Sequence, residues 1–397
     1  MTQKLQEIFT QFLENKPIFA QRAALTISFT PETIPHREKQ IADLGRILAP
    51  ALRGGKPSNV FIYGRTGTGK SLVSLFVCSE LKKAAKGNDI KPIYINCKMK
   101  KVADTEYRLL AGLLKELGED VPFTGLPTDQ LYQTLFKKVD EKEQVVLLII
   151  DEIDALVAKT GDEILYNLTR ANSELKKAKL ALIGITNDLG FIERLDPRIK
   201  SSLSEEELLF PPYNAVQLQD ILRQRASLAF VPGVLEDGVI EKAAALAAQE
   251  HGDARRALDL LRVAGELAER AAEAKVTIKH VDAAQDKIDQ DRVLEIVKSQ
   301  ARQSQAVLWA IIQATEGKKA VESGHVFDAY NKICIAHGLK PLTQRRVSDL
   351  IAELDLFGII NTKVISRGRG GRTRLISTNL SSLTLTKLKN TLMEIFI

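Results

Sequence analysis

The alternation of apolar and polar residues divides the chain into stretches of different character. Between residues 36 and 212, helical patterns alternate with short apolar runs at 59–63, 92–96, 144–150, 180–186 and 207–210. Strands separated by helices predict a parallel sheet with crossover connections, so an α/β fold is expected here. Residues 214–299 show helical periodicity alone, which predicts an all-α unit. Residues 300–397 contain three helical patterns followed by two short strands, at 359–366 and 373–377.

Prolines mark the expected boundaries between these stretches. Pro31 and Pro35 end an N-terminal arm, and the pair Pro211–Pro212 ends the α/β stretch. Asn214, shortly after that pair, is a suitable N-cap for the next helix. A chain of 397 residues exceeds one typical domain. We therefore predict an arm at 1–34, an α/β base at 35–212, a helical unit at 213–299 and a C-terminal unit at 300–397.

The strongest chemical motif lies between the first strand and the helix that follows it. Residues 64–71 fit the pattern GxxxxGK[ST] at every position. Glycines let backbone N–H groups surround phosphate oxygens, and the helix N-terminus adds positive potential. Lys70 is expected to neutralise the β- and γ-phosphates of ATP, and Ser71 to bind Mg²⁺. An ordinary glycine-rich turn is the alternative. The predicted ATP/ADP-binding residues are Gly64, Arg65, Thr66, Gly67, Thr68, Gly69, Lys70 and Ser71.

Two further strands end in polar residues. The run 145–150 predicts a strand buried on both faces, and Asp151 and Glu152 follow it directly. Open α/β sheets bind their ligands at the carboxyl ends of the strands. Asp151 is therefore expected to hold Mg²⁺, partly through water, and Glu152 to polarise the attacking water. Asn187, after the strand at 180–186, is expected to reach the γ-phosphate or that water. The alternatives are a helix N-cap for the acidic pair and a turn-forming role for Asn187.

These three elements, in this order, resemble an AAA+ ATPase, with the helical unit as its lid. Within that unit, residues 252–258 read Gly-Asp-Ala-Arg-Arg-Ala-Leu and resemble the sensor-2 motif. The resemblance implies that Arg255 reaches the γ-phosphate. The alternative for Arg255 is a surface ion pair with Asp253 or Asp259.

A second arginine stands where AAA+ proteins carry a finger aimed at the nucleotide of a neighbouring subunit. Residues 195–202 occupy that place, and Arg198 is the candidate. Eukaryotic relatives often carry a second arginine where this chain has Ser202. Because of this departure, the sequence decides neither whether Arg198 is such a finger nor whether the protein must form a ring. The alternative for Arg198 is a loop residue that forms a salt bridge.

Positive charge is concentrated in the last quarter of the chain. The net charge is +6, yet residues 301–397 carry 14 basic and 7 acidic residues, a net of +7, and residues 1–300 carry a net of −1. Thr343 is the expected cap of a helix whose apolar residues recur at i, i+3, i+4 and i+7 from Val347. Arginine on the opposite face is the residue type that reads guanine in a major groove. The candidates for DNA contact on this helix are Gln344, Arg345, Arg346 and Ser348.

A basic hairpin follows that helix. It carries Lys363, Arg367, Arg369, Arg372 and Arg374 with no acidic residue between them. Its glycine-rich tip at 368–372 allows the backbone to approach phosphates or a minor groove closely. Three helices and a basic hairpin resemble a winged helix-turn-helix, which implies contact with double-stranded DNA. The alternatives are a solvated charged face and a protein-binding surface.

Two helical patterns at 104–117 and 127–141 lie between the second and third strands, where a minimal AAA+ base has less. They resemble the inserted helix by which origin-recognition initiators touch the duplex. Thr124, Gly125 and Leu126, in the loop between them, are the candidate contacts. A purely structural helical hairpin is the alternative.

Base, lid and winged helix together are similar to the archaeal origin-recognition/cell-division-control initiator family, from Pro35 to about Ser377. The resemblance implies a slow ATPase that acts as a switch, binds origin DNA and helps recruit or load the minichromosome maintenance helicase, with other initiator paralogues as further partners. The residues by themselves reach only a Mg²⁺-ATP switch joined to a DNA reader. A branch-migration motor and a nucleotide-responsive transcription regulator are the alternatives.

Several classes of protein are excluded. No apolar run approaches the roughly 20 residues of a membrane span, and the first residues show no signal peptide. The three cysteines have no metal-ligand spacing, which favours reduced thiols in a cytosolic protein. We expect a cytoplasmic protein associated with the nucleoid.

Overall fold

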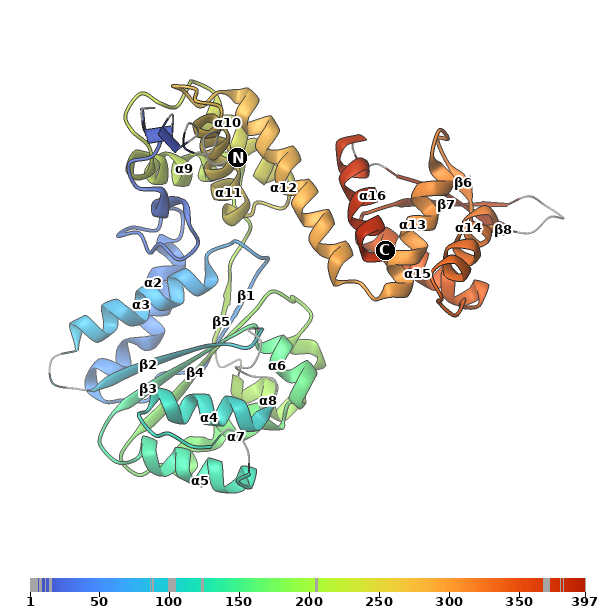
Figure 1. The fold of residues 1–397 in the computed structure, drawn as a ribbon. Coiled ribbons are helices and arrows are strands. Elements are labelled where there is room, and N and C mark those ends of the chain that lie inside the picture. The colour runs from blue at the N-terminus through green and yellow to red at the C-terminus, as the bar shows by residue number, and fades with distance from the viewer. Residues whose placement is uncertain are drawn as a thin grey trace. The chain divides into compact units, whose positions relative to one another are not determined.

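The computed structural model describes residues 6, 9, 10, 12, 13, 16–85, 87, 89–98, 105–122, 125–203, 206–366, 372–378, 380 and 382–396, without the side chains of 366, 372, 382 and 383. Contacts within the chain divide it into two units, Met1–Val281 and Asp282–Ile397. Figure 1 shows the elements of both units. No helix in the described ranges is long and apolar enough to cross a membrane.

The base is built on a five-stranded parallel sheet. Its strands are β1 (Val60–Tyr63), β2 (Ile90–Asn96), β3 (Val145–Asp151), β4 (Lys179–Thr186) and β5 (Glu206–Leu209), in the order β2-β3-β4-β1-β5. Every residue of β3 is buried, because helices cover both faces of the sheet. The predicted parallel sheet is confirmed, and all five carboxyl ends meet at one edge.

The helices described around this sheet are α2 (Glu38–Leu48), α3 (Lys70–Ala84), α4 (Glu106–Glu116), α5 (Thr128–Val139), α6 (Ile153–Thr160), α7 (Glu163–Arg170) and α8 (Pro197–Leu203). Side chains of β1 alternate between the two faces, as strand geometry requires. Ile62 belongs to the core cluster that includes α2 and α3, whereas Phe61 belongs to the cluster on the other face that includes α4 and α5, and its ring stacks with Phe191. Figure 1 shows these helices on the two faces of the sheet. The short helices α6 and α8 were not predicted from the sequence.

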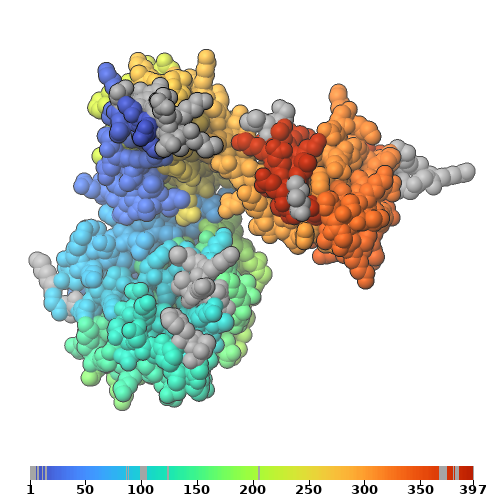
Figure 2. Space-filling model, in the orientation of Figure 1, coloured from blue at the N-terminus to red at the C-terminus, as the bar shows by residue number. Residues whose placement is uncertain are grey.

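The lid consists of α9 (Ala215–Ala229), α10 (Val239–Gln249), α11 (Ala254–Arg270) and α12 (Ile278–Ser299), the last of which continues into the second unit. A capping box begins α9: Asn214 Oδ1 accepts from the Gln217 N–H at 2.9 Å, and Gln217 Oε1 accepts from the Asn214 N–H at 3.0 Å. Arm residues between 18 and 21 hydrogen-bond to the end of α9 and to the segment that follows it (the arm is dark blue in Figure 2). The rings of Phe19 and Phe230 stack 4.9 Å apart, and Arg225 donates to the carbonyls of Ala24 and Phe29.

The second unit has the winged-helix arrangement. It contains α13 (Arg302–Thr315), β6 (Val321–Glu322), α14 (Ser323–Ala336), α15 (Gln344–Leu356), β7 (Asn361–Ser366), β8 (Arg372–Ser377) and α16 (Ser382–Phe396). The expected helix over 321–336 begins two residues later, because Val321 and Glu322 pair antiparallel with β8. The sheet therefore has three strands, in the order β6-β8-β7, rather than the two predicted. Helix α16 is a further element that the sequence pattern did not reveal.

Candidate functional site

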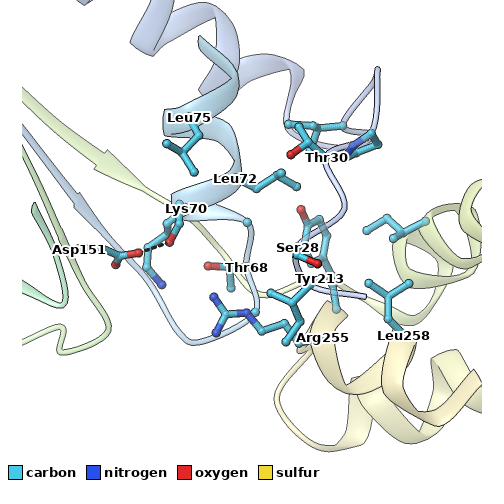
Figure 3. Close-up of a pocket in the computed structure, with 18 of the residues that line it drawn as sticks. Ser28, Thr30, Thr68, Lys70, Leu72, Leu75, Asp151, Tyr213, Arg255 and Leu258 are labelled. Carbon is cyan, nitrogen blue, oxygen red and sulfur yellow. Dashed lines mark hydrogen bonds between the residues drawn. The ribbon is translucent and has the colours of Figure 1, made fainter. Parts of the chain in front are cut away.

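A cavity of about 450 Å³ lies where the arm, the carboxyl edge of the sheet and the lid meet (Figure 3). The structure brings nine of the predicted residues to its wall: Gly67, Thr68, Gly69, Lys70, Ser71, Asp151, Glu152, Asn187 and Arg255. They come from positions up to 188 residues apart in the sequence, so the fold assembles them. Gly64, Arg65 and Thr66 precede this wall in the same loop, and Arg198 does not line the cavity.

Lys70 is held at the first turn of α3 with its ammonium among oxygen atoms. Its Nζ donates to Gly64 O, to Arg65 O and to Asn187 Oδ1, each at 2.7 Å. Burial lowers the pKa of Lys70 to about 8; the charge of Asp151 opposes this shift and that of Arg255 adds to it. A buried cation among neutral acceptors is suited to binding an anion. The contact with Lys70 places Asn187 inside the site, so it does more than form a turn.

Asp151 is oriented by hydroxyl groups from two other elements. Ser71 Oγ donates to Asp151 Oδ2 at 2.5 Å, and Tyr94 OH donates to the same oxygen at 2.7 Å. Burial, and the hydrogen bond to Asp151, raise the pKa of Tyr94 to about 12. Hard cations such as Mg²⁺ prefer carboxylate and hydroxyl oxygens, so Ser71 and Asp151 fit that ion. Tyr94 could not be predicted as a site residue, because nothing in the sequence pattern distinguishes it from the other residues of β2.

Glu152 sits at the N-cap position of α6 with a left-handed backbone, φ +57°. Such a conformation costs a residue with a side chain about 1 kcal/mol or more, and it occurs often at functional sites. Its side chain makes no capping hydrogen bond, and the residue lines the cavity. Glu152 therefore occupies the N-cap position, as the alternative supposed, but its carboxylate does not cap the helix. Thr186 Oγ1 donates to Asp154 Oδ1 at 2.6 Å and ties the end of β4 to α6.

The N-terminus of α11 brings the lid to the phosphate-binding loop. Asp253 Oδ1 caps this helix by accepting from the Arg255 N–H at 2.8 Å, and the Ala254 N–H donates to Gly67 O at 3.2 Å. Figure 3 shows the Arg255 side chain extending toward Thr68. Among the described residues Arg255 forms no ion pair, and Asp259 pairs with Arg262 instead. The ion-pair alternative for Arg255 therefore does not describe this structure.

Arg198 lies outside the cavity on α8. Its guanidinium makes two contacts with Asp196, at 3.0 and 3.1 Å, and lies over the ring of Tyr166. The side chain is 69% exposed, so water screens this pair. The salt bridge of the alternative reading is present. A finger role concerns a neighbouring subunit and stays a prediction.

Sequence reasoning missed residues that shape the apolar part of the cavity. The arm lines it from Ile27 to Pro35, and the lid adds Tyr213, Ile221 and Leu258. These side chains suit a planar, largely apolar group such as a nucleobase. The arm carries no sequence motif, so nothing in the sequence pattern places it at the cavity.

The predicted DNA-contacting helix has the expected two faces. Val347, Leu350, Ile351 and Leu354 of α15 are buried, whereas Gln344, Arg345 and Arg346 are exposed and Ser348 is half-buried. Thr343 Oγ1 accepts from the Arg346 N–H at 3.4 Å, in the position of a cap. Arg374 on β8 donates to Ser348 O at 3.1 Å and so joins the hairpin to α15.

The other predicted DNA contacts are distributed unevenly. Lys363 is exposed on β7. Thr124, Arg367 and Arg369 lie outside the described residues, and so does the side chain of Arg372. Gly125 is exposed with φ +110°, while Leu126 packs against the core beneath α4 and α5. The Leu126 side chain therefore has a structural partner within the base.

Three family models match successive parts of the chain. Residues 53–190 match the AAA domain, 219–286 the Cdc6 AAA+ ATPase-type lid domain, and 295–387 the CDC6 C-terminal winged helix domain. Together with the fold and the cavity, these matches define the class of protein. It is an AAA+ ATPase with a helical lid and a C-terminal winged helix.

Relatives narrow this class to one family. The chain is 52% identical over 396 residues to the ORC1-type DNA replication protein of Pyrococcus furiosus, covering 98% of this chain and 93% of the relative. It is 50% identical to ORC1-type DNA replication protein 1 of Sulfurisphaera tokodaii, covering 98% and 96%. The solved structure of the Aeropyrum pernix ORC1 protein in complex with DNA has a TM-score of 0.83 and 45% identity, covering 96% and 98%. The chain belongs to the ORC1-type DNA replication protein family, which confirms the resemblance and the fold class.

Proposed function

We propose that this protein is a replication initiator that binds duplex DNA at an origin and changes its binding with the nucleotide it holds. One observation carries the proposal: a single chain joins a cavity lined from both base and lid to a winged helix with an exposed arginine face. The relatives are named for DNA replication, and the Aeropyrum pernix ORC1 structure was solved with DNA, which supports the same function here.

In this proposal the phosphate-binding loop receives ATP or ADP. Lys70 binds the β- and γ-phosphates, and the amides of residues 67–71 bind phosphate oxygens. Ser71 and Asp151 hold Mg²⁺, partly through water, and Tyr94 orients the Asp151 carboxylate for that task. When bound, Mg²⁺ neutralises phosphate charge. The apolar wall formed by the arm and Leu258 receives the base.

Hydrolysis would use the polar residues at the ends of β3 and β4. Glu152 would orient the attacking water and accept its proton, and Asn187 would hold the γ-phosphate or that water. Arg255 stabilises charge on the γ-phosphate from the lid side. Because Arg255 belongs to the lid, loss of the γ-phosphate removes one bond between lid and base. We propose that the protein is a slow ATPase and that hydrolysis serves to weaken the contact between lid and base. Arg198 is proposed to act on the nucleotide of a neighbouring subunit.

The winged-helix unit would read the DNA. Arg345, with Gln344, Arg346 and Ser348, faces base edges, and Lys363 with the hairpin arginines binds phosphates. The loop containing Gly125 is proposed as a second contact with DNA, one that depends on the shape of the loop more than on its charge. The replicative minichromosome maintenance helicase and other initiator paralogues are the proposed protein partners. The protein would act in the cytoplasm at the nucleoid.

Footprinting on genomic fragments with ATP and with ADP tests this function. For the wild type, we expect a discrete protected site near a replication start whose extent differs between ATP and ADP. For Lys70→Ala, we expect the footprint to be the same with either nucleotide. Lys83→Ala, which alters an exposed lysine on the same helix, is the matched control. Identical footprints with ATP, ADP and Lys70→Ala would contradict the switch.

Two further measurements separate the alternatives. A branch-migration motor requires brisk DNA-stimulated hydrolysis and movement of a branched substrate, whereas an initiator turns over slowly. A transcription regulator with nucleotide as structural filler requires that Glu152→Ala leave function intact.

A further inference from the structure

Arg37 is a buried arginine whose partners are carbonyl groups. It is 2% exposed, directly before α2, and forms no ion pair within the part of the chain that the structure describes. Its Nε donates to Thr68 O at 2.9 Å and its Nη2 to Pro211 O at 2.6 Å. Its guanidinium carbon lies 3.9 Å from the centre of the Tyr213 ring. A buried cation is costly, so these contacts must offset its desolvation.

On one side, Arg37 contacts the outer surface of the phosphate-binding loop. A trans peptide is planar, and its C=O and N–H point in opposite directions. Thr68 O is bonded to Arg37, so the Gly69 N–H of the same peptide points away from Arg37. Gly69 lines the cavity and Arg37 does not, so this N–H points toward the cavity. The preceding carbonyl, Gly67 O, accepts from the Ala254 N–H of the lid, and Ala254 itself lines the cavity. Two successive loop peptides are therefore held, one by Arg37 outside the cavity lining and one by the lid.

On its other side, Arg37 contacts the segment that joins base and lid. Pro211 O belongs to this connection, and Tyr213 follows two residues later. The Tyr213 N–H donates to Gly252 O at 3.3 Å, next to the cap of α11. A side chain at Gly69, where φ is +89°, would put its Cβ 3.1 Å from Tyr213 OH. Loop, Arg37 and connection are thus in direct contact.

We propose that Arg37 is a positioning residue that fixes the Thr68–Gly69 peptide against the base–lid connection, so that phosphate binding and lid placement are coupled. This inference rests on the proposed nucleotide function. A phosphate oxygen that engages the Gly69 N–H displaces or fixes the Thr68 carbonyl at the other end of the same peptide. The guanidinium bonded to that carbonyl transmits the constraint to Pro211 and Tyr213. Lysine cannot replace it, because only a planar fork reaches two carbonyls while stacking on a ring.

Arg37→Lys and Arg37→Met in the full chain test the proposal. ADP affinity is measured by calorimetry, and backbone hydrogen exchange is followed at 66–71 and 213–216 with and without ADP. In the wild type, ADP is expected to slow exchange in both segments. In Arg37→Lys we expect the ADP Kd to rise about tenfold, as for the loss of a charge-assisted hydrogen bond, and the ADP-dependent protection of 213–216 to disappear.

Arg225→Lys is the matched control. Arg225 is also buried, donates to two carbonyls and stacks on a ring, but its partners lie in the arm rather than in the loop. Because Arg225 itself lines the cavity, it is a control for exchange without nucleotide and not for ADP affinity. In the absence of nucleotide, Arg225→Lys is expected to speed exchange at 20–30, and Arg37→Lys at 66–71. Faster exchange at 66–71 in both variants would mean that any buried arginine has this effect, and would overturn the proposal.

The remaining outcomes are also decisive. Arg37→Lys with an ADP Kd within twofold of the wild type and unchanged protection shows a merely structural residue. If the variants do not fold, the wild type decides: protection by ADP at 66–71 without protection at 213–216 refutes the coupling. A wild type that binds neither ATP nor ADP refutes the proposed function instead.

Discussion

Replacing Gly67 by alanine tests how closely the phosphate-binding loop is packed against the lid. Gly67 has φ +68°, and an added Cβ would lie 1.6 Å from Asp253 Oδ1 and 2.2 Å from its Cγ. The left-handed backbone costs an alanine about 1–2 kcal/mol. The clash also forces Asp253 away from the Arg255 N–H that it caps at 2.8 Å, and losing such a cap costs about 1 kcal/mol. We expect Gly67→Ala to lower the free energy of unfolding by about 2–3 kcal/mol.

A double-mutant cycle separates these two contributions. Asp253→Ala alone should cost about 1 kcal/mol, for the cap. In that background the clash and the cap are already gone, so Gly67→Ala should cost only its backbone strain of about 1–2 kcal/mol. The expected coupling energy is therefore about 1 kcal/mol, within the range for residues in contact. Gly45→Ala is the control, because its Cβ meets nothing within 4 Å and alanine favours the interior of α2.

Urea unfolding can assign the effect to one unit. Circular dichroism follows both units, whereas the single tryptophan, Trp309, lies in the unit Asp282–Ile397. We expect Gly67→Ala to shift the dichroism transition and to leave the Trp309 fluorescence transition in place. An equal cost of Gly67→Ala with and without Asp253 would refute the packing argument.

Three further predictions concern hydrolysis, acid stability and DNA. Glu152→Gln should keep ADP affinity within about twofold, because the phosphate contacts of the loop remain, and reduce single-turnover hydrolysis at least 100-fold. Burial by itself would raise the pKa of Glu266, but Arg22 and Arg262 hold this pKa below its ordinary value of 4.5. The charged carboxylate therefore stabilises the fold fully above pH 4.5, and this stabilisation is lost as the pH falls below that value. Glu266→Gln should make the free energy of unfolding depend less steeply on pH in the acid range. Arg345→Ala should cost about 1–3 kcal/mol on the specific duplex and little on random DNA, whereas Lys363→Ala should weaken both and reduce the salt slope by about one; equal losses on both duplexes for Arg345→Ala would remove it from base readout.

The nucleotide cavity could be predicted where its residues follow a local pattern. The loop at 64–71 is contiguous, and Asp151 and Asn187 each follow an apolar strand. Parallel strands bring such ends to one edge whatever the details of packing. The contact of Lys70 with Asn187 is the result of that rule.

Contacts that depend on tertiary packing could not be predicted. Arg37 meets Thr68 and Pro211, which are 31 and 174 positions away, and no periodicity links them. Tyr94 reaches Asp151 only because β2 and β3 are neighbours in the sheet. Strand β6 is two residues long and exists through its pairing with β8, so a helical pattern beginning at Val321 was the natural reading.

Charge counting also has a limit in the winged-helix unit. The basic excess predicts a set of contacts available to DNA, yet the Arg374 guanidinium donates a hydrogen bond to Ser348 O. Arg346 lies 3.7 Å from Asp349 on the same helix. Burial and partners, which the sequence does not give, decide which cations face solvent. Of the described candidates, Arg345 and Lys363 are exposed and form no ion pair with a described residue.

The lid is joined to the phosphate-binding loop by a few polar contacts. Ala254 N donates to Gly67 O, and Arg65 contacts His251 at 2.9 Å. Each such bond contributes about 1 kcal/mol, so these two together contribute about 2 kcal/mol. A ligand can shift a lid only by the difference in its affinity for the two positions. A bond from Arg255 to a γ-phosphate, at about 1.5–3 kcal/mol for a charged pair, is of the same size. On the proposed role of Arg255, gain or loss of that one phosphate would therefore match in energy the polar contacts between the lid and the loop.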